Sequence, residues 1–191
     1  MKLKHQIEIQ DCKFLGSGAE GSVFLTKDGL AIKAFKKIKN AIAEEEILKI
    51  TKDSPFFPKC IVRASNIIIR EYVEGENLYE YIIKNGISYN LSKEIIDLIE
   101  DFKRLKFTRL NIRNSHIFVN KNCKIKVIDP RKPFSKITPY PRDIIEILIR
   151  ARVFDEFLKH LLDYKPELLS FWTEGYRYLA TIRKRRIQKY A

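Results

Sequence analysis

A glycine-rich stretch followed by a lysine constrains the fold of this chain more than any other feature. The stretch reads LGSGAEGSV over residues 15–23, and AIK follows at residues 31–33. Glycine has no Cβ, so a glycine-rich backbone can bring its N–H groups close to a phosphate. Strand-like runs at 7–15 and 22–26 flank the loop, which predicts a hairpin and disfavours a dinucleotide site, where the loop would open a helix. An accidental glycine-rich hairpin is the alternative.

Length and composition set the class of protein. The 191 residues, of which 45% are hydrophobic and 12% aromatic, are enough for one domain or a small two-lobed unit with a packed core. The three cysteines, Cys12, Cys60 and Cys123, are widely spaced, which argues against a zinc site and predicts a cytoplasmic protein. No apolar run approaches the roughly 20 residues of a membrane span. The abundance of Ile, Lys and Glu leans towards a thermophile.

The hydrophobic pattern changes character near Val73. Before it, strands are predicted at 22–26, 30–35 and 67–73, with one helix at 40–50. Asp28-Gly29, between the first two strands, is a hairpin turn signal. After it, helices are predicted at 77–83, at 91–107 and from 142 onward, with a small hairpin formed by 117–119 and 125–128. The sequence therefore predicts an α+β protein, mostly strands in its first part and mostly helices in the rest.

The order of these motifs resembles the protein kinase superfamily, over about residues 12–150. The resemblance implies a bilobal protein kinase-like fold in one domain, residues 1–191, with a β-rich N-lobe at 1–73 and a reduced helical C-lobe at 74–191. The shortness of the segment at 131–141 resembles RIO-type and other small atypical kinases of archaea.

The resemblance assigns ATP-binding roles to the first part of the chain. Lys33 would reach the phosphates, and Glu44 would hold it there, with Glu45 and Glu46 as alternatives. Glu71 and Val73 would bind the adenine through their backbone, beside an unusual Arg70. The remaining predicted nucleotide contacts are Leu15, Gly16, Ser17, Gly18, Gly21, Val23 and Ala31.

The catalytic residues implied by the resemblance depart from the family's pattern. Asn111 stands in place of the aspartate base, and loss of a general base costs about 10²- to 10⁴-fold in rate. Arg113 stands near the loop lysine and would neutralise the transferred phosphoryl group. His116 stands in place of a metal-binding asparagine.

Asp129, in the tripeptide Asp129-Pro130-Arg131, stands where the family's metal-binding aspartate stands. A turn before proline is the structural alternative. The expected metal is Mg²⁺, or Mn²⁺ because of the imidazole of His116. Asp143 resembles the aspartate that ties down the catalytic loop, with a helix N-cap as the alternative.

Two functions are consistent with these residues. The first is an ATP-dependent Ser/Thr protein kinase, slow because Asn111 lacks a carboxylate, acting on an unknown protein substrate. The second is a pseudokinase that binds nucleotide or serves as a scaffold.

The formal net charge of +13 favours acidic partners. The basic cluster at Arg183, Lys184, Arg185 and Arg186 closes a predicted helix, and would bind RNA or an acidic protein. A lysine-rich solvated surface, with cations at the negative end of a helix dipole, is the alternative.

Overall fold

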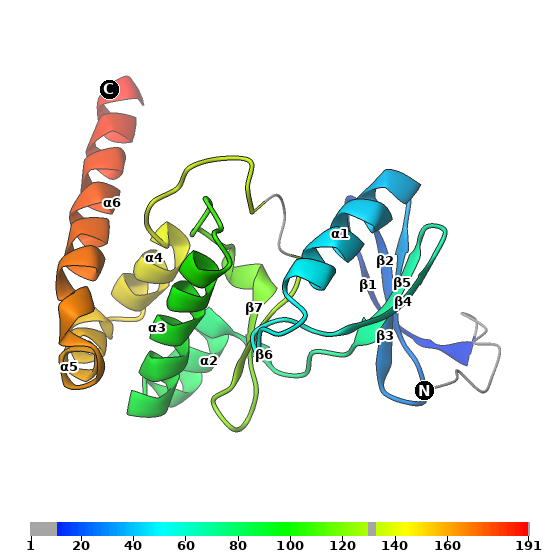
Figure 1. Ribbon diagram of the computed structural model, residues 1–191. Coiled ribbons are helices and arrows are strands. Elements are labelled where there is room, and N and C mark those ends of the chain that lie inside the picture. Colours follow the sequence, from blue (N-terminus) through cyan, green and yellow to red (C-terminus); the bar gives the residue numbers. More distant parts are fainter. Residues whose placement is uncertain (1–10, 130–132, 191) are drawn as a thin grey trace. The chain divides into compact units, whose positions relative to one another are not determined.

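The chain is an α+β protein built as two compact units, Met1–Val73 and Glu74–Ala191 (Figure 1). The computed structural model describes residues 11–129 and 133–190, with the backbone alone at 183–190. The two units are described separately below.

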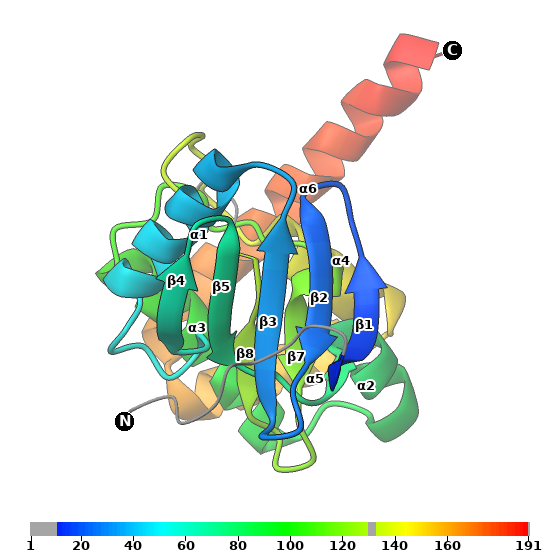
Figure 2. The same ribbon diagram turned by 90° about the vertical axis from the view of Figure 1, so that its right-hand side faces the viewer.

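The N-terminal unit contains a five-stranded antiparallel sheet in the order β1-β2-β3-β5-β4 (Figure 2). The strands are β1 (Lys13–Ser17), β2 (Gly21–Leu25), β3 (Leu30–Phe35), β4 (Cys60–Ala64) and β5 (Ile67–Glu71). The hairpin of β2 and β3 forms as predicted around Asp28-Gly29, where Gly29 has a positive φ of 76°. The sequence pattern missed β4, an edge strand whose Ile61 and Val62 are exposed, because it shows no alternation of apolar and polar residues.

Helix α1 (Ile38–Ile50) packs against β3, β4 and β5. Its buried residues are Ala41, Glu44 and Leu48, which lie on one face because three- and four-residue steps return to the same side of a helix. Ala41 and Leu48 form a small apolar core with Phe35 and Ile68 of the sheet. A glutamate is thus the one acidic residue on the buried face of α1.

The C-terminal unit is mostly helical, with a three-stranded antiparallel sheet in the order β6-β7-β8. The strands are β6 (Glu76–Asn77), β7 (Ile117–Val119) and β8 (Ile125–Val127). The helices are α2 (Leu78–Asn85), α3 (Tyr89–Arg104), α4 (Arg142–Arg150), α5 (Phe154–Tyr164) and α6 (Leu169–Tyr190), with 3₁₀ turns η2 (Asn114–His116) and η3 (Pro166–Leu168).

The core of this unit forms around α3. Ile95, Leu98, Ile99 and Phe102, which the apolar period of the sequence places on one face, are almost completely buried. Leu105, the fifth residue of that predicted face, follows the end of the helix and is half-buried. Helix α5 packs on α3, and the Phe157 ring lies 4.7 Å from the ring of Trp172 on α6. Large aromatic contacts of this kind contribute strongly to core stability.

Helix α3 ends at Arg104, three residues before the predicted end. Lys106 adopts a left-handed conformation (φ 58°), and its N–H donates to the carbonyl of Lys103. The N–H of Phe107 donates to the carbonyl of Phe102, and the two rings lie 5.3 Å apart. This is a Schellman motif with its usual apolar contact, and it stops the helix and turns Phe107 inward.

Within the described residues, no helix is both long enough and apolar enough to cross a membrane.

Candidate functional site

The glycine loop joins β1 to β2 and is closed by its own backbone. The N–H of Gly18 donates to the carbonyl of Gly21 at 2.8 Å, and the N–H of Lys36 donates to the carbonyl of Glu20 at 2.7 Å. A Cβ added at Gly16 or Gly18 would meet no atom within 4 Å, so this part of the loop is open.

Gly21 has a different reason for being glycine. A Cβ at this position would lie 2.0 Å from the carbonyl oxygen of Ala34, well inside contact distance. Gly21 therefore lets β2 pass close to β3, and it is needed for the fold of the sheet whether or not the loop binds a ligand. Of the other predicted loop residues, Leu15 and Ser17 are exposed and Val23 pairs with Lys33 across β2 and β3.

Lys33 and Glu44 form a buried ion pair. Lys33 comes from the middle of β3 and Glu44 from the buried face of α1, and their residues are 7% and 8% exposed. The Lys33 ammonium also lies 4.7 Å from the centre of the Phe35 ring. Burial of two charged groups is tolerated only when each has a strong hydrogen-bonding partner of opposite charge. The ion pair therefore holds the lysine side chain in a defined position.

The choice among the three glutamates follows from the helical period. Glu45 lies beside the buried face and binds Arg63 at 2.6 Å and Lys49 at 3.0 Å. These two cations lower the pKa of the Glu45 carboxyl, the hydrogen bond from Arg63 having the larger effect. Glu46 is exposed. Glu44 alone of the three meets Lys33, as the sequence analysis preferred.

Arg70 on β5 is only 5% exposed. It lies opposite Ala31 in the register of β3 and β5, and Ala31 is itself buried. The Arg70 guanidinium donates a hydrogen bond of 3.0 Å to the carbonyl of Glu71. The Glu71 carboxylate accepts from the N–H of Lys59 at 3.1 Å, and Val73 follows at the end of this unit. The unusual arginine is therefore engaged with the backbone carbonyl next to it.

In the C-terminal unit, Asn111 is tied to Asp143 by two hydrogen bonds. The Asn111 Nδ2 donates to Asp143 Oδ1 at 2.9 Å, and the Asn111 Oδ1 accepts from the backbone N–H of Asp143 at 2.8 Å. Asp143 is the second residue of α4, whose N-cap, Pro141, makes no side-chain hydrogen bond. Asn111 thus satisfies one of the otherwise unpaired N–H groups at the start of α4. Asp143 does tie down this loop, through the side chain of Asn111.

A second asparagine fixes the other end of the loop. Asn114 Oδ1 accepts from the N–H of Tyr79 at 2.9 Å, and its Nδ2 donates to Asn77 Oδ1 at 2.8 Å. Asn77 is the N-cap of α2. The exposed Arg113 therefore projects from a segment held on both sides.

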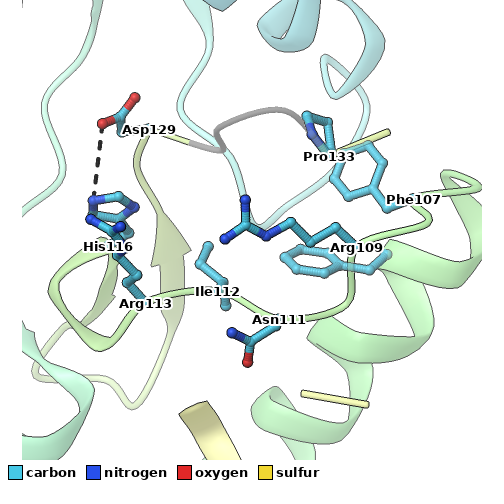
Figure 3. A pocket seen from close by; sticks show the side chains of 9 residues that line it. Phe107, Arg109, Asn111, Ile112, Arg113, His116, Asp129 and Pro133 are labelled. Carbon is cyan, nitrogen blue, oxygen red and sulfur yellow. Dashed lines mark ion pairs between the residues drawn. The ribbon is translucent and has the colours of Figure 1, made fainter. Parts of the chain in front are cut away.

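The 3₁₀ turn η2 brings His116 beside Asp129. The N–H of Ile128 donates to the carbonyl of His116 at 2.9 Å, which places Asp129 just beyond β8 next to the turn. The His116 Nε2 and Asp129 Oδ2 atoms are 3.9 Å apart (Figure 3). Asp129 has a left-handed backbone (φ 51°), a conformation that aspartate tolerates better than most residues.

These residues line a cavity of about 70 Å³. Its polar lining includes two arginines, one histidine and one aspartate (Figure 3). The lining residues are Phe102, Phe107, Arg109, Asn111, Ile112, Arg113, His116, Asp129 and Pro133. Predicted residues Asn111, Arg113, His116 and Asp129 thus come together from positions spread over 19 residues of sequence.

The donors at this cavity partly fit a divalent metal. Mg²⁺ commonly takes one or two protein carboxylates and completes its shell with phosphate oxygens and water, and Asp129 supplies one such carboxylate. The His116 nitrogen suits Mn²⁺ better than Mg²⁺. Within the described residues, no group of three or more His, Cys, Asp or Glu side chains could hold a metal by itself.

The structure adds Arg109 and Phe107 to the predicted residues. The sequence analysis assigned no role to Arg109, and it predicted Phe107 inside a helix. The Pro130 and Arg131 of the predicted tripeptide lie outside the described residues, and so do the side chains of the basic cluster at 183–186. Comparisons with models of known protein families and with curated proteins found no match.

Proposed function

We propose that this chain is an ATP-dependent phosphotransferase with a protein kinase-like fold, acting on serine or threonine of a protein. In this proposal the glycine loop and Lys33 bind the nucleotide phosphates, and Asp129 binds Mg²⁺ or Mn²⁺ with His116. Phosphoryl transfer asks the protein mainly to position phosphates and to neutralise charge, which these residues are suited to do.

The buried Lys33–Glu44 pair carries the proposal. Burial of two charges is expensive, and a pair of apolar residues would stabilise the unit as well or better. A lysine held extended by a helix glutamate, on the strand after an open glycine loop, is an arrangement suited to a phosphate ligand. The metal chemistry would come from Asp129, while Arg113 would neutralise charge on the transferred group.

Asn111 favours a second candidate, a pseudokinase that binds nucleotide without efficient transfer. Its carboxamide is bonded to Asp143 through both its nitrogen and its oxygen, and it offers no carboxylate to accept the substrate proton. Arg70 adds to this, because the Glu71 carbonyl that the resemblance assigns to the adenine already accepts a hydrogen bond. The two candidates share nucleotide binding and differ in turnover.

Nucleotide binding is tested by thermal shift with millimolar ATP and either Mg²⁺ or Mn²⁺. Ligand at 100 times its dissociation constant stabilises a protein by about 2.7 kcal/mol. The test variant is the double substitution Lys33→Met with Glu44→Gln, because Lys33→Met alone would leave a buried unpaired glutamate. Lys27→Met, at an exposed lysine of the β2–β3 turn, is the matched control. We expect the shift in the wild type and the control and its loss in the double variant. No shift in the wild type would refute nucleotide binding.

Turnover is tested by incubation with radiolabelled ATP. Labelling by the wild type that disappears in Asp129→Ala would support the phosphotransferase. Nucleotide binding with equal background labelling in both proteins would favour the pseudokinase.

A further inference from the structure

The C-terminal cavity contains a basic residue for which the proposed function has no role. We propose that Arg109 binds an anionic side chain of the protein acceptor, so that the substrate carries a carboxylate or phosphate beside the target hydroxyl. This inference rests on the proposed function and names the substrate class of the same site.

Arg109 projects from a hydrogen-bonded backbone. Its N–H donates to the carbonyl of Pro133 at 3.0 Å, and it forms an isolated parallel bridge with Thr138. The next N–H, of Leu110, donates to the carbonyl of Thr138 at 3.1 Å. Figure 3 shows the guanidinium reaching into the cavity, which Phe107 also lines. A fixed backbone and an apolar wall reduce the entropy lost when such a side chain binds a ligand.

The charges around the cavity leave this arginine available. Among the described residues, no hydrogen bond or ion pair involves the guanidinium groups of Arg109 and Arg113. The lining carboxylate, Asp129, lies beside His116. Other acids of this unit are engaged elsewhere: Asp143 binds Asn111, and Asp101 binds Arg104. Among the described residues that line the cavity, two are arginines and one is an aspartate.

The cavity and its arginines indicate the kind of ligand. A volume of about 70 Å³ has room for a small charged group. Carboxylates and phosphates match the planar fork of a guanidinium, which binds them through two parallel hydrogen bonds. A glutamate, aspartate or phosphoserine side chain of a peptide presents such a group on a short stem. The inference is therefore an acidic peptide acceptor.

The test measures peptide binding by fluorescence anisotropy without nucleotide. Three labelled peptides share one serine and differ in the residues beside it. The first has aspartate and glutamate there, the second has asparagine and glutamine, and the third has phosphoserine. Hydrogen bonds to a charged group are worth about 1.5–3 kcal/mol, which corresponds to roughly 10- to 100-fold in affinity. We expect the wild type to prefer the acidic and phosphorylated peptides by at least about tenfold.

Arg109→Gln is expected to remove this preference, and Arg177→Gln, at an exposed arginine of α6, is expected to keep it. Arg109→Lys keeps the positive charge but lacks the planar guanidinium, and it is expected to retain only part of the preference. This variant replaces Arg109→Gln as the test if the glutamine variant is unstable. The inference is overturned if Arg109→Gln leaves the preference intact, or if Arg177→Gln abolishes it equally. Equal binding of glycerol 3-phosphate and the acidic peptide would also overturn it, in favour of a small-molecule acceptor.

A parallel thermal shift with ATP separates this inference from the proposed function. Arg109→Gln is expected to keep the nucleotide shift, and loss of that shift would assign Arg109 to the nucleotide and overturn the inference. A wild type that prefers acidic peptides but shows no nucleotide shift would refute the proposed function and leave the anion site standing.

Discussion

The substitution Asn111→Asp, which gives position 111 the carboxylate found in active kinases, is expected to destabilise the protein. In the wild type, Asn111 Nδ2 lies 2.9 Å from Asp143 Oδ1. After the substitution, two carboxylates face each other at that distance. Both cannot remain ionised, because two like charges 2.9 Å apart repel by about 6 kcal/mol at an effective dielectric constant near 20.

The less costly outcome is that one carboxyl takes up a proton and donates the hydrogen bond. An ordinary aspartic acid has a pKa near 3.9, and each pH unit above it costs about 1.36 kcal/mol. Keeping one proton at pH 7 therefore costs about 4 kcal/mol, and at pH 5 about 1.5 kcal/mol. The pKa of the pair is raised in the folded state, so folding binds a proton and the variant loses stability as pH rises from about 4 until that raised pKa is reached.

The assay is urea unfolding of wild type and variant between pH 5 and 8. The matched control is the double substitution Asn111→Asp with Asp143→Asn, which exchanges the two groups. The carboxylate introduced at position 111 can accept from the backbone N–H of position 143 and from the new amide there. We expect the double variant to recover at least about 2 kcal/mol at pH 7 relative to the single one. A pH-independent loss, or no recovery in the double variant, would refute the proposed hydrogen-bonding roles.

Three further predictions concern other parts of the chain. Gly21→Ala is expected to lower the free energy of unfolding by about 1–3 kcal/mol, because its Cβ would collide with the carbonyl of Ala34. Gly18→Ala, measured by the same urea unfolding, should be nearly neutral. Equal losses in the two variants would contradict the close approach of β2 and β3. Arg70→Met is expected to raise ATP affinity by about 2- to 10-fold in a competition assay, because it frees the Glu71 carbonyl. Unchanged or weaker binding would show that Arg70 does not compete with the adenine for this carbonyl. Removal of residues 183–191 is expected to weaken RNA binding in filter assays at low salt and to make that binding less dependent on salt. RNA binding that survives the truncation would show that other basic residues are responsible for it.

The sequence alone predicted much of the fold because local patterns determined it. The Asp28-Gly29 turn specified the β2–β3 hairpin, and the apolar period specified the buried face of α3. The choice of Glu44 over its neighbours came instead from the resemblance to the kinase pattern, and the structure places Glu44 on the buried face of α1. The sequence pattern could not reveal β4, whose pairing depends on β5, or the Schellman motif at Lys106, where a lysine occupies a position usually taken by glycine.

The tertiary structure decided what the residues of the C-terminal cavity do. The sequence marked Asn111 as a degraded base, but only the fold shows its carboxamide bonded to Asp143 at the start of α4. Arg109 had no role assigned from the sequence, and its place in the cavity depends on a backbone contact with residues 133–138. The reason is physical: helical and hairpin periods are read from neighbours in the sequence, whereas hydrogen-bond partners and cavity walls come from segments up to about 30 residues apart.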